Sequence, residues 1–147
     1  MVDENEQAIV DIIRQLCSRL SAERVTMKEA GESLGTISKQ TGTELAIRPS
    51  HPSLEEARVV GESAGPGSLS HVTLKLRTPS PLSLKALEDK FGPSRPVPRT
   101  SHSPGPRAGF FVDTPGQPYT CAIIAGLSRD GKLATELIVR RDIRLKG

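Results

Sequence analysis

Aromatic residues are scarce in this chain, whose 147 residues include no tryptophan, three phenylalanines and one tyrosine. A folded core must therefore be built mainly from aliphatic side chains. Three of the four aromatic residues, Phe110, Phe111 and Tyr119, lie within one short stretch. Because aromatic side chains often anchor protein contacts, this stretch is a candidate contact surface.

The motifs that usually carry catalysis are also missing. The sequence contains no glycine-rich phosphate loop, no Gly-x-Ser-x-Gly nucleophile turn and no His-Glu-x-x-His zinc motif. The histidines lie near prolines or at a strand edge, where most are surface residues: His51, His71 and His102. His51 beside Glu55 and Glu56 is a candidate acid–base cluster, but nothing else in the sequence converges on it. We therefore expect no enzymatic activity, no cofactor and no metal site.

Only two cysteines are present, Cys17 and Cys121, and neither belongs to a spacing pattern that would bind zinc. Each falls on the apolar side of its expected element, so we interpret both as small buried side chains. The pattern permits a disulfide between them but does not support one. In the middle of an apolar strand, Cys121 should be inert as a nucleophile.

No apolar run is long enough to cross a membrane, and residues 1–6 are acidic where a secretion signal would be basic. We therefore expect a cytoplasmic protein without membrane insertion. The charge is uneven: residues 1–78 hold 9 Lys and Arg against 11 Asp and Glu, whereas residues 79–147 hold 11 against 6. The net charge of +3 is too small for a dedicated nucleic-acid binder, but the basic second part suits an acidic partner.

Residues 1–22 predict an amphipathic helix. Apolar residues recur with a period of about 3.6, and no glycine or proline interrupts them. The apolar positions are Ile9, Ile12, Ile13, Leu16, Cys17 and Leu20. Asp3 and Glu6 have the spacing of a cap at the start of a helix. We expect the apolar stripe of this helix to pack against the core.

A ten-residue stretch occurs twice, at Thr26–Gly35 and Ser83–Gly92. Both copies begin with a hydroxyl residue that can cap a helix and end with a glycine that can stop one. Both also carry apolar residues at the same offsets. The period of 57 residues predicts a duplicated unit, with one repeat in residues 23–80 and the other in residues 81–147 of a single compact domain.

Three strand-like runs follow each copy, which predicts two αβββ repeats and an α+β fold with an antiparallel sheet. The expected strands are Thr43–Arg48, Ala57–Glu62, His71–Thr78, Gly109–Asp113, Tyr119–Leu127 and Leu133–Asp142.

A hairpin should join the last two strands through Asp130-Gly131. We predict a three-residue loop with Gly131 in the left-handed region. This loop gathers one apolar face by pairing Leu127 with Leu133, Ile123 with Leu137 and Cys121 with Val139. A two-residue turn, which would pair Leu127 with Ala134, mixes polar and apolar residues on each face.

The proline-rich segment Pro93–Ala108 carries Arg95, Arg99, His102 and Arg107 and no acidic residue. One interpretation is a solvated loop, and the other is a basic recognition arm beside Phe110 and Phe111. Because successive strand residues point to opposite faces, one of these two phenylalanines must point away from the buried face of the sheet.

The pattern [Ser/Thr]-x-x-x-[Ala/Leu]-x-x-x-[Leu/Phe]-Gly, followed by antiparallel strands, resembles the outer-membrane assembly lipoprotein (SmpA/OmlA) family. Its tandem form resembles the β-lactamase inhibitory protein type, and Phe91-Gly92-Pro93 is similar to the helix-ending phrase of the family. The resemblance covers residues 23–142. It implies helices packed on one face of an antiparallel sheet and a protein partner bound on the exposed face. The chain lacks a lipobox cysteine, and its first helix has no counterpart in the family.

Together these features predict a non-enzymatic protein-interaction module, such as an adaptor, inhibitor or assembly factor. We expect the partner to contact the exposed sheet face and the aromatic and basic loop of the second repeat. The candidate contact residues are Thr73, Lys75, Arg77, Arg95, Arg99, Arg107, Phe110, Phe111, Tyr119 and Arg140. An open edge strand also offers a route to a homodimer.

Three alternatives remain open. A nucleic-acid-contacting protein would use the basic loop 93–108 and the basic C-terminal tail Arg140–Lys146. A secretion-chaperone-like binding protein is suggested by a similar order of helices and strands, although type III secretion chaperones tend to be acidic. An enzyme would need a small-molecule pocket between the sheet and the first helix.

Overall fold

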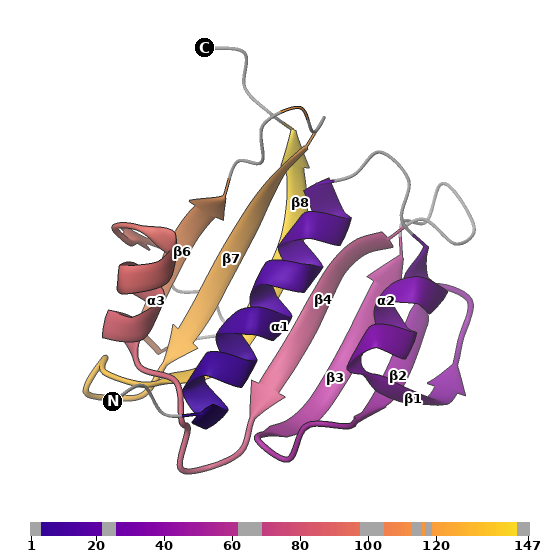
Figure 1. The fold of residues 1–147 in the computed structure, drawn as a ribbon, viewed down its shortest axis with the longest axis horizontal. Helices are drawn as coiled ribbons and strands as arrows, with labels where there is room; N and C mark the ends of the chain where they lie inside the picture. Colours follow the sequence, from indigo (N-terminus) through magenta and orange to yellow (C-terminus); the bar gives the residue numbers. More distant parts are fainter. Residues whose placement is uncertain are drawn as a thin grey trace.

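Three helices and one antiparallel sheet form the fold in the computed structural model, which describes residues 4–21, 26–61, 69–97, 105–112, 116 and 119–143 (Figure 1). The helices are α1 (Glu4–Ser21), α2 (Met27–Leu34) and α3 (Leu84–Phe91). The predicted N-terminal helix and the α+β class are confirmed. Asp3, the expected cap residue of α1, lies outside the described residues.

The two short helices begin and end where the repeated stretch predicts. The Thr26 hydroxyl accepts a hydrogen bond from the Glu29 N–H at 3.1 Å, and the Ser83 hydroxyl accepts one from the Ala86 N–H at 3.0 Å. Each bond satisfies an N–H group that the first helical turn leaves without a partner. Gly35 and Gly92 are the C-cap residues. Local hydrogen bonding thus accounts for both boundaries of each helix.

Four strands follow each short helix, whereas the αβββ prediction expected three. After α2 come β1 (Gly35–Gln40), β2 (Glu44–Pro49), β3 (Leu54–Gly61) and β4 (Leu69–Leu76). After α3 come β5 (Arg95–Pro96), β6 (Arg107–Val112), β7 (Tyr119–Leu127) and β8 (Ala134–Ile143).

The two additional strands, β1 and β5, give little signal in the sequence. β1 has one large apolar residue, Ile37, and most of its residues are exposed. β5 has only two residues, one of which is a proline, and lies in the segment expected to be a loop. Both are the outermost strands of the sheet, so neither needs the apolar alternation of a half-buried strand.

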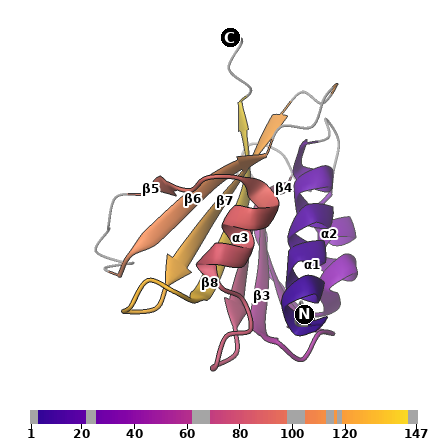
Figure 2. The same cartoon turned by 60° about the vertical axis from the view of Figure 1, so that its left-hand side comes forward.

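The sheet order is β1-β2-β3-β4-β8-β7-β6-β5, with every neighbouring pair antiparallel. The last strand of each half therefore meets its counterpart at the centre of the sheet, where Leu74 pairs with Leu137. All three helices lie on one face: α2 over β1–β3, α1 over β4, β8 and β7, and α3 beside β6 (Figure 2). In the described part of the chain, no helix covers the other face.

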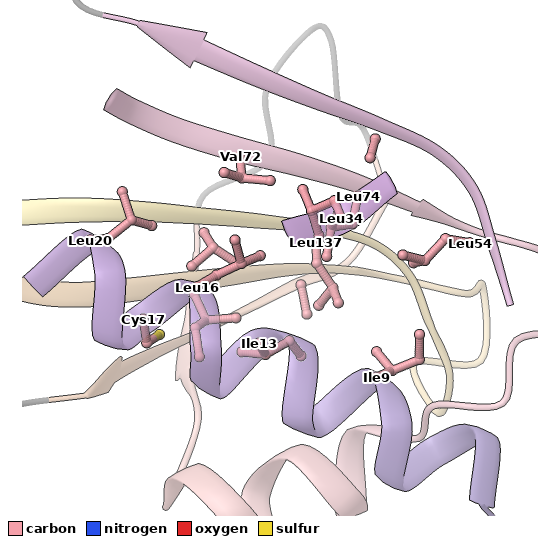
Figure 3. Packing of buried hydrophobic residues seen from close by; sticks show 14 of the residues in the cluster. Ile9, Ile13, Leu16, Cys17, Leu20, Leu34, Leu54, Val72, Leu74 and Leu137 are labelled. Carbon is pink, nitrogen blue, oxygen red and sulfur yellow. The ribbon is translucent and has the colours of Figure 1, made fainter. Parts of the chain in front are cut away.

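The core lies between the helices and the sheet. Helix α1 points Ile9, Ile13 and Leu16 toward the central strands, where Val72 and Leu74 are also fully buried (Figure 3). Every second residue of the strands points toward the helices and forms the sheet side of the core. The apolar stripe of the first helix therefore packs as predicted.

Cys17 of α1 and Cys121 of β7 form a disulfide in this core, with their Cα atoms 5.2 Å apart. The predicted burial is correct, since the two residues are 2% and 0% exposed. The disulfide, which the sequence permits but does not support, forms because α1 crosses β7 at the level of Cys121. This crossing brings together residues that lie 104 positions apart, and no local pattern reveals it.

The β7–β8 hairpin has a different register from the predicted one. Gly131 has the expected left-handed conformation, with φ of 73°. However, Leu127 pairs with Ala134, and Ile123 pairs with Val139 rather than with Leu137. The chain around Leu133 pairs instead with the segment before α3, through hydrogen bonds from the Leu84 N–H to the Lys132 carbonyl and from the Ala134 N–H to the Leu82 carbonyl. The competing pairing shifts β8 along β7.

Cys121 consequently pairs with Arg141 instead of Val139. Ile123 and Val139 still face α1, because a shift of two residues leaves every side chain on its original face. The predicted apolar face is therefore correct, although its pairs are not.

Candidate protein-binding surface

The outer face of the sheet, opposite the helices, differs sharply between its two halves. On β2, β3 and β4 it carries charged and polar side chains, whereas on β6 and β7 its centre is apolar. Each half contains a shallow hollow between the side chains of neighbouring strands. We call these the polar hollow and the Phe111 hollow.

The polar hollow encloses about 430 Å³. Its lining residues are Glu44, Glu56, Arg58, Val60, His71, Thr73, Lys75 and Glu136. Arg58 forms an ion pair with Glu44 at 3.4 Å, and Lys75 forms one with Glu55 at 3.9 Å. Acidic and basic side chains are thus mixed in this half of the outer face, and the ion pairs between them partly cancel their charges.

His71 lies where the two halves meet. It pairs across the strands with Arg140 of β8. Burial lowers the pKa of His71, and the positive charge of Arg140 lowers it further, whereas Glu44 acts in the opposite direction. The imidazole is therefore neutral at pH 7.

The Phe111 hollow encloses about 290 Å³. Its lining consists of Val97, Gly109, Phe110, Phe111, Ala122, Ile123 and Ile124, with Arg95 and Arg140 as the charged members. Among the described residues, Phe111 is the only large apolar residue that is exposed, with 47% of its surface accessible. The guanidinium of Arg95 lies 5.2 Å from the centroid of the Phe111 ring. This distance is within the range of a cation–π contact, which orients Arg95 at the edge of the hollow.

A missing side chain helps to shape this hollow. Gly109 lies on the outer face of β6, opposite Ile124 of β7. An added Cβ at Gly109 would approach a methyl group of Val97 at 3.0 Å. The absence of a side chain at position 109 therefore lets the segment after β5 pack closely against the strand.

The structure brings six of the ten predicted contact residues to the outer face. They are Thr73, Lys75, Arg95, Arg107, Phe111 and Arg140, placed there by strand alternation and pairing. Arg77 directly follows β4 and is exposed beside Glu55 and Thr78. Arg99 lies outside the described residues.

Two of the predicted contact residues do not point their side chains to this surface. Phe110 is 1% exposed and points into the core, because it alternates with the outward-facing Phe111. Tyr119 lies on the same face as Cys121, and its ring stacks with Arg141, whose guanidinium is 4.3 Å away. The expected rim from Phe110 to Tyr119 is therefore split between the two faces of the sheet.

Sequence reasoning missed the apolar residues around Phe111. Ala122 and Ile124 of β7 and Ile138 of β8 alternate with core residues and therefore face outward. A signal was present, since β7 contains the unbroken apolar run Cys121–Ala125. Such a run is typical of a strand that is covered on both faces rather than on one.

The remaining chemistry of the described residues is simple. No three His, Cys, Asp or Glu side chains gather closely enough to hold a metal ion in this part of the chain. The Nδ1 atom of His51 accepts the backbone N–H of Ser53 at 3.1 Å, which makes it part of a turn. None of the described helices is long and apolar enough to cross a membrane.

No protein-family model, curated protein or solved structure matches the chain. The arrangement of the outer face is therefore the basis on which a function can be proposed.

Proposed function

We propose that the protein is a non-enzymatic interaction module that binds a partner protein through the outer face of its sheet. The Phe111 hollow is the observation that carries this proposal. A half-exposed phenylalanine and a neighbouring arginine are the residue types that most often anchor protein interfaces. They lie on a sheet face that no helix covers among the described residues.

The partner would cover the outer face of the sheet, as the helices cover the inner face. A β-sheet with apolar residues on both faces is stabilised when both are covered. Here the helices cover one face, and Phe111 and Ile124 contribute apolar surface to the other. The roles that fit are those of an adaptor, an inhibitor or an assembly factor, in line with the SmpA/OmlA resemblance.

We also propose that the two halves of the chain arose by duplication. In each half, a helix with a hydroxyl N-cap and a glycine C-cap precedes four antiparallel strands. We infer that the two halves derive from one ancestral unit and that the second half has specialised in binding. Its hollow is apolar with arginine at its edges, whereas that of the first half is mixed in charge.

The cytoplasmic location remains a prediction from the sequence. The buried disulfide between Cys17 and Cys121 weighs against it, because disulfides persist mainly in oxidising compartments. Acid quenching of cells, unfolding in urea and alkylation without reduction, followed by mass spectrometry of the Cys17 peptide, distinguish a cytoplasmic from an oxidising location. A cytoplasmic protein should be alkylated there on unfolding without prior reduction.

A homodimer formed through the edge strand β1 is a weaker proposal. The register of β1 against β2 shifts between Ile37 and Lys39, and Lys39 places a charge on the edge strand. Both features hinder strand-to-strand association. A single monomeric species in sedimentation at high protein concentration would remove this route.

The proposed function is tested by capturing partners with variants of the tagged protein. Phe111→Ser and Lys75→Glu alter the two halves of the outer face. Lys28→Glu on α2 is the matched control, because Lys28 and Lys75 are both exposed and each lies 3.9 Å from a glutamate. We expect chemical cross-linking in lysate to recover a partner with wild type and Lys28→Glu, and much less with the outer-face variants. Equal recovery with all four proteins would refute the proposal.

A further inference from the structure

We propose that the Phe111 hollow binds the free carboxyl terminus of a partner chain whose last residue has a large apolar side chain. The terminal carboxylate would bind Arg95, and the apolar side chain would pack against the Phe111 ring. This inference rests on the proposed function and specifies which part of the partner binds. It follows from the position of Arg95 over the ring, from the small residues beside the ring and from the charges around the hollow.

Arg95 and Phe111 offer a charged contact and an apolar contact at one place. The Arg95 guanidinium lies 5.2 Å from the centroid of the Phe111 ring, and both side chains line the hollow. A guanidinium presents its N–H donors in a planar fork that can bind both oxygens of a carboxylate. Among the described residues, no acidic side chain lines the hollow, so none competes with a bound carboxylate there.

Arg140, the other charged residue of the hollow, is already engaged within the protein. It pairs with His71 across the strands and interacts with its own surroundings. It also lies in a different row of the sheet. Arg140 and Phe111 both pair with Ala122, whereas Arg95 pairs with Gly109. We therefore assign the carboxylate of the partner to Arg95 alone.

Small residues beside the ring leave room for the side chain of the partner. Gly109 precedes Phe111 by two positions on β6, and Ala122 of β7 pairs with Phe111. Ile124 pairs with Gly109 and is half-buried. The hollow that these residues line encloses about 290 Å³. A large apolar side chain can therefore lie over Gly109 and Ile124 and contact the Phe111 ring.

A chain terminus fits this arrangement better than an internal acidic residue does. In a terminal residue, the carboxylate and the side chain leave the same Cα atom, so they reach two groups that lie close together. In an extended internal segment, adjacent side chains point to opposite sides, and residues i and i+2 lie about 6.6–6.8 Å apart. This separation exceeds the 5.2 Å between the Arg95 guanidinium and the centroid of the Phe111 ring.

The charges outside the hollow also favour a single carboxylate at Arg95. Glu136 of β8 pairs with Gly126, one row beyond the pair of Ile124 and Ile138, and three glutamates line the polar hollow. These side chains repel an anion that moves away from Arg95 along the outer face. A nucleic-acid strand carries a phosphate at every nucleotide and needs a continuous basic track, which Glu136 interrupts.

The test is an NMR titration of the ¹⁵N-labelled full chain with N-acetylated peptides. The probe is Gly-Ser-Gly-Ser-Phe with a free carboxyl terminus. One control is the same peptide with a C-terminal amide, and a second replaces its phenylalanine with serine. A third, Gly-Ser-Phe-Ser-Glu-Ser-Gly amide, carries its only carboxylate inside the chain. We expect the probe to shift the amide signals of Phe111, Ala122 and Ile124, and each control to bind about five-fold more weakly or worse.

Variants of the protein identify the group that binds the carboxylate. Arg95→Gln should weaken binding of the probe by about five-fold or more, as expected for a charged hydrogen bond that solvent partly screens, and leave the amide control unchanged. Lys75→Gln is the matched control, because Lys75 is also an exposed cation of the outer face, and it should preserve the preference for the probe. Raising the salt concentration should weaken the probe but not its amide.

Four outcomes would overturn the inference. They are equal binding of the probe and its amide, equal or tighter binding of the peptide with the internal glutamate, shifts centred on the polar hollow, and a higher affinity for single-stranded oligothymidine than for the probe. The titration uses no cellular partner, so it fails independently of the capture experiment. If partners depend on Phe111 but the probe does not bind, the carboxyl terminus is wrong and the proposed function stands.

Discussion

Cys17 and Cys121 are joined by a disulfide that fastens the central helix α1 to strand β7. Both residues are buried among aliphatic side chains. The bond closes a loop that includes α2, α3 and six of the eight described strands. It therefore ties the first helix to the half of the sheet that carries the Phe111 hollow.

Reduction of this disulfide should lower the free energy of unfolding by about 2–5 kcal/mol, because a cross-link over a long loop restricts the unfolded chain. Urea unfolding with and without dithiothreitol measures the difference. The double variant Cys17→Ala/Cys121→Ala should be less stable than oxidised wild type and insensitive to dithiothreitol. A wild-type midpoint that does not move on reduction, with loss of the bond verified by mass, would contradict the prediction.

Glu6 connects α1 to the start of α3. Its carboxylate accepts hydrogen bonds from the Ser83 N–H at 3.1 Å and from the Ser83 hydroxyl at 3.3 Å. We predict that Glu6→Ala lowers the free energy of unfolding by about 1–2 kcal/mol, because it leaves partly buried donors without an acceptor. Glu6→Gln keeps an acceptor oxygen and should lose less, and Glu4→Ala on the exposed side of α1 is the surface control. Similar losses for Glu4→Ala and Glu6→Ala in urea unfolding would show that the bonds to Ser83 contribute nothing.

His71 should make stability depend on pH. Burial and the nearby Arg140 lower its pKa in the folded protein, so the unfolded chain binds a proton more readily. The contribution of this group is therefore fully present above pH 6.5, the value for the unfolded chain, and is lost as the pH falls through the folded pKa. Glu44 opposes the shift and reduces the size of the effect.

The variant His71→Gln isolates this contribution. Wild type should lose more stability than the variant when urea unfolding is repeated from pH 7.5 down to pH 5. Other titrating groups contribute equally to both proteins, so the difference between the two curves reports on His71. Parallel curves across this range would rule out a lowered pKa.

The sequence predicts the helices of this fold well because their boundaries are local. A hydroxyl side chain bonds to an N–H group three residues later, and a glycine ends the helix, so the signal lies within ten residues. The same holds for strands such as β4, where Val72, Leu74 and Leu76 alternate with polar residues. Period alone then identifies the element and its buried face.

Features set by distant parts of the chain were not predictable in this way. The register of β7 against β8 depends on the bonds that join Leu82 and Leu84 to the chain around Leu133. Likewise, the disulfide depends on where α1 crosses the sheet. For the candidate site, alternation predicts that one of Phe110 and Phe111 faces outward, but it does not tell which. Tyr119 lies on the helix-covered face of the sheet, opposite to Phe111, and this position follows only from the observed strand pairing.

Among the described glycines, Gly35 has the least room for a side chain. A Cβ added there would clash with the carbonyl oxygen of Arg48, a backbone atom of the paired strand β2. We predict that Gly35→Ala lowers the free energy of unfolding by about 2–4 kcal/mol, because the two strands must move apart at the point where β1 leaves α2. Gly42→Ala is the matched control, since a Cβ there meets no atom within 4 Å. If urea unfolding gives the two alanine variants the same stability, the close approach of Gly35 to Arg48 does not exist in solution.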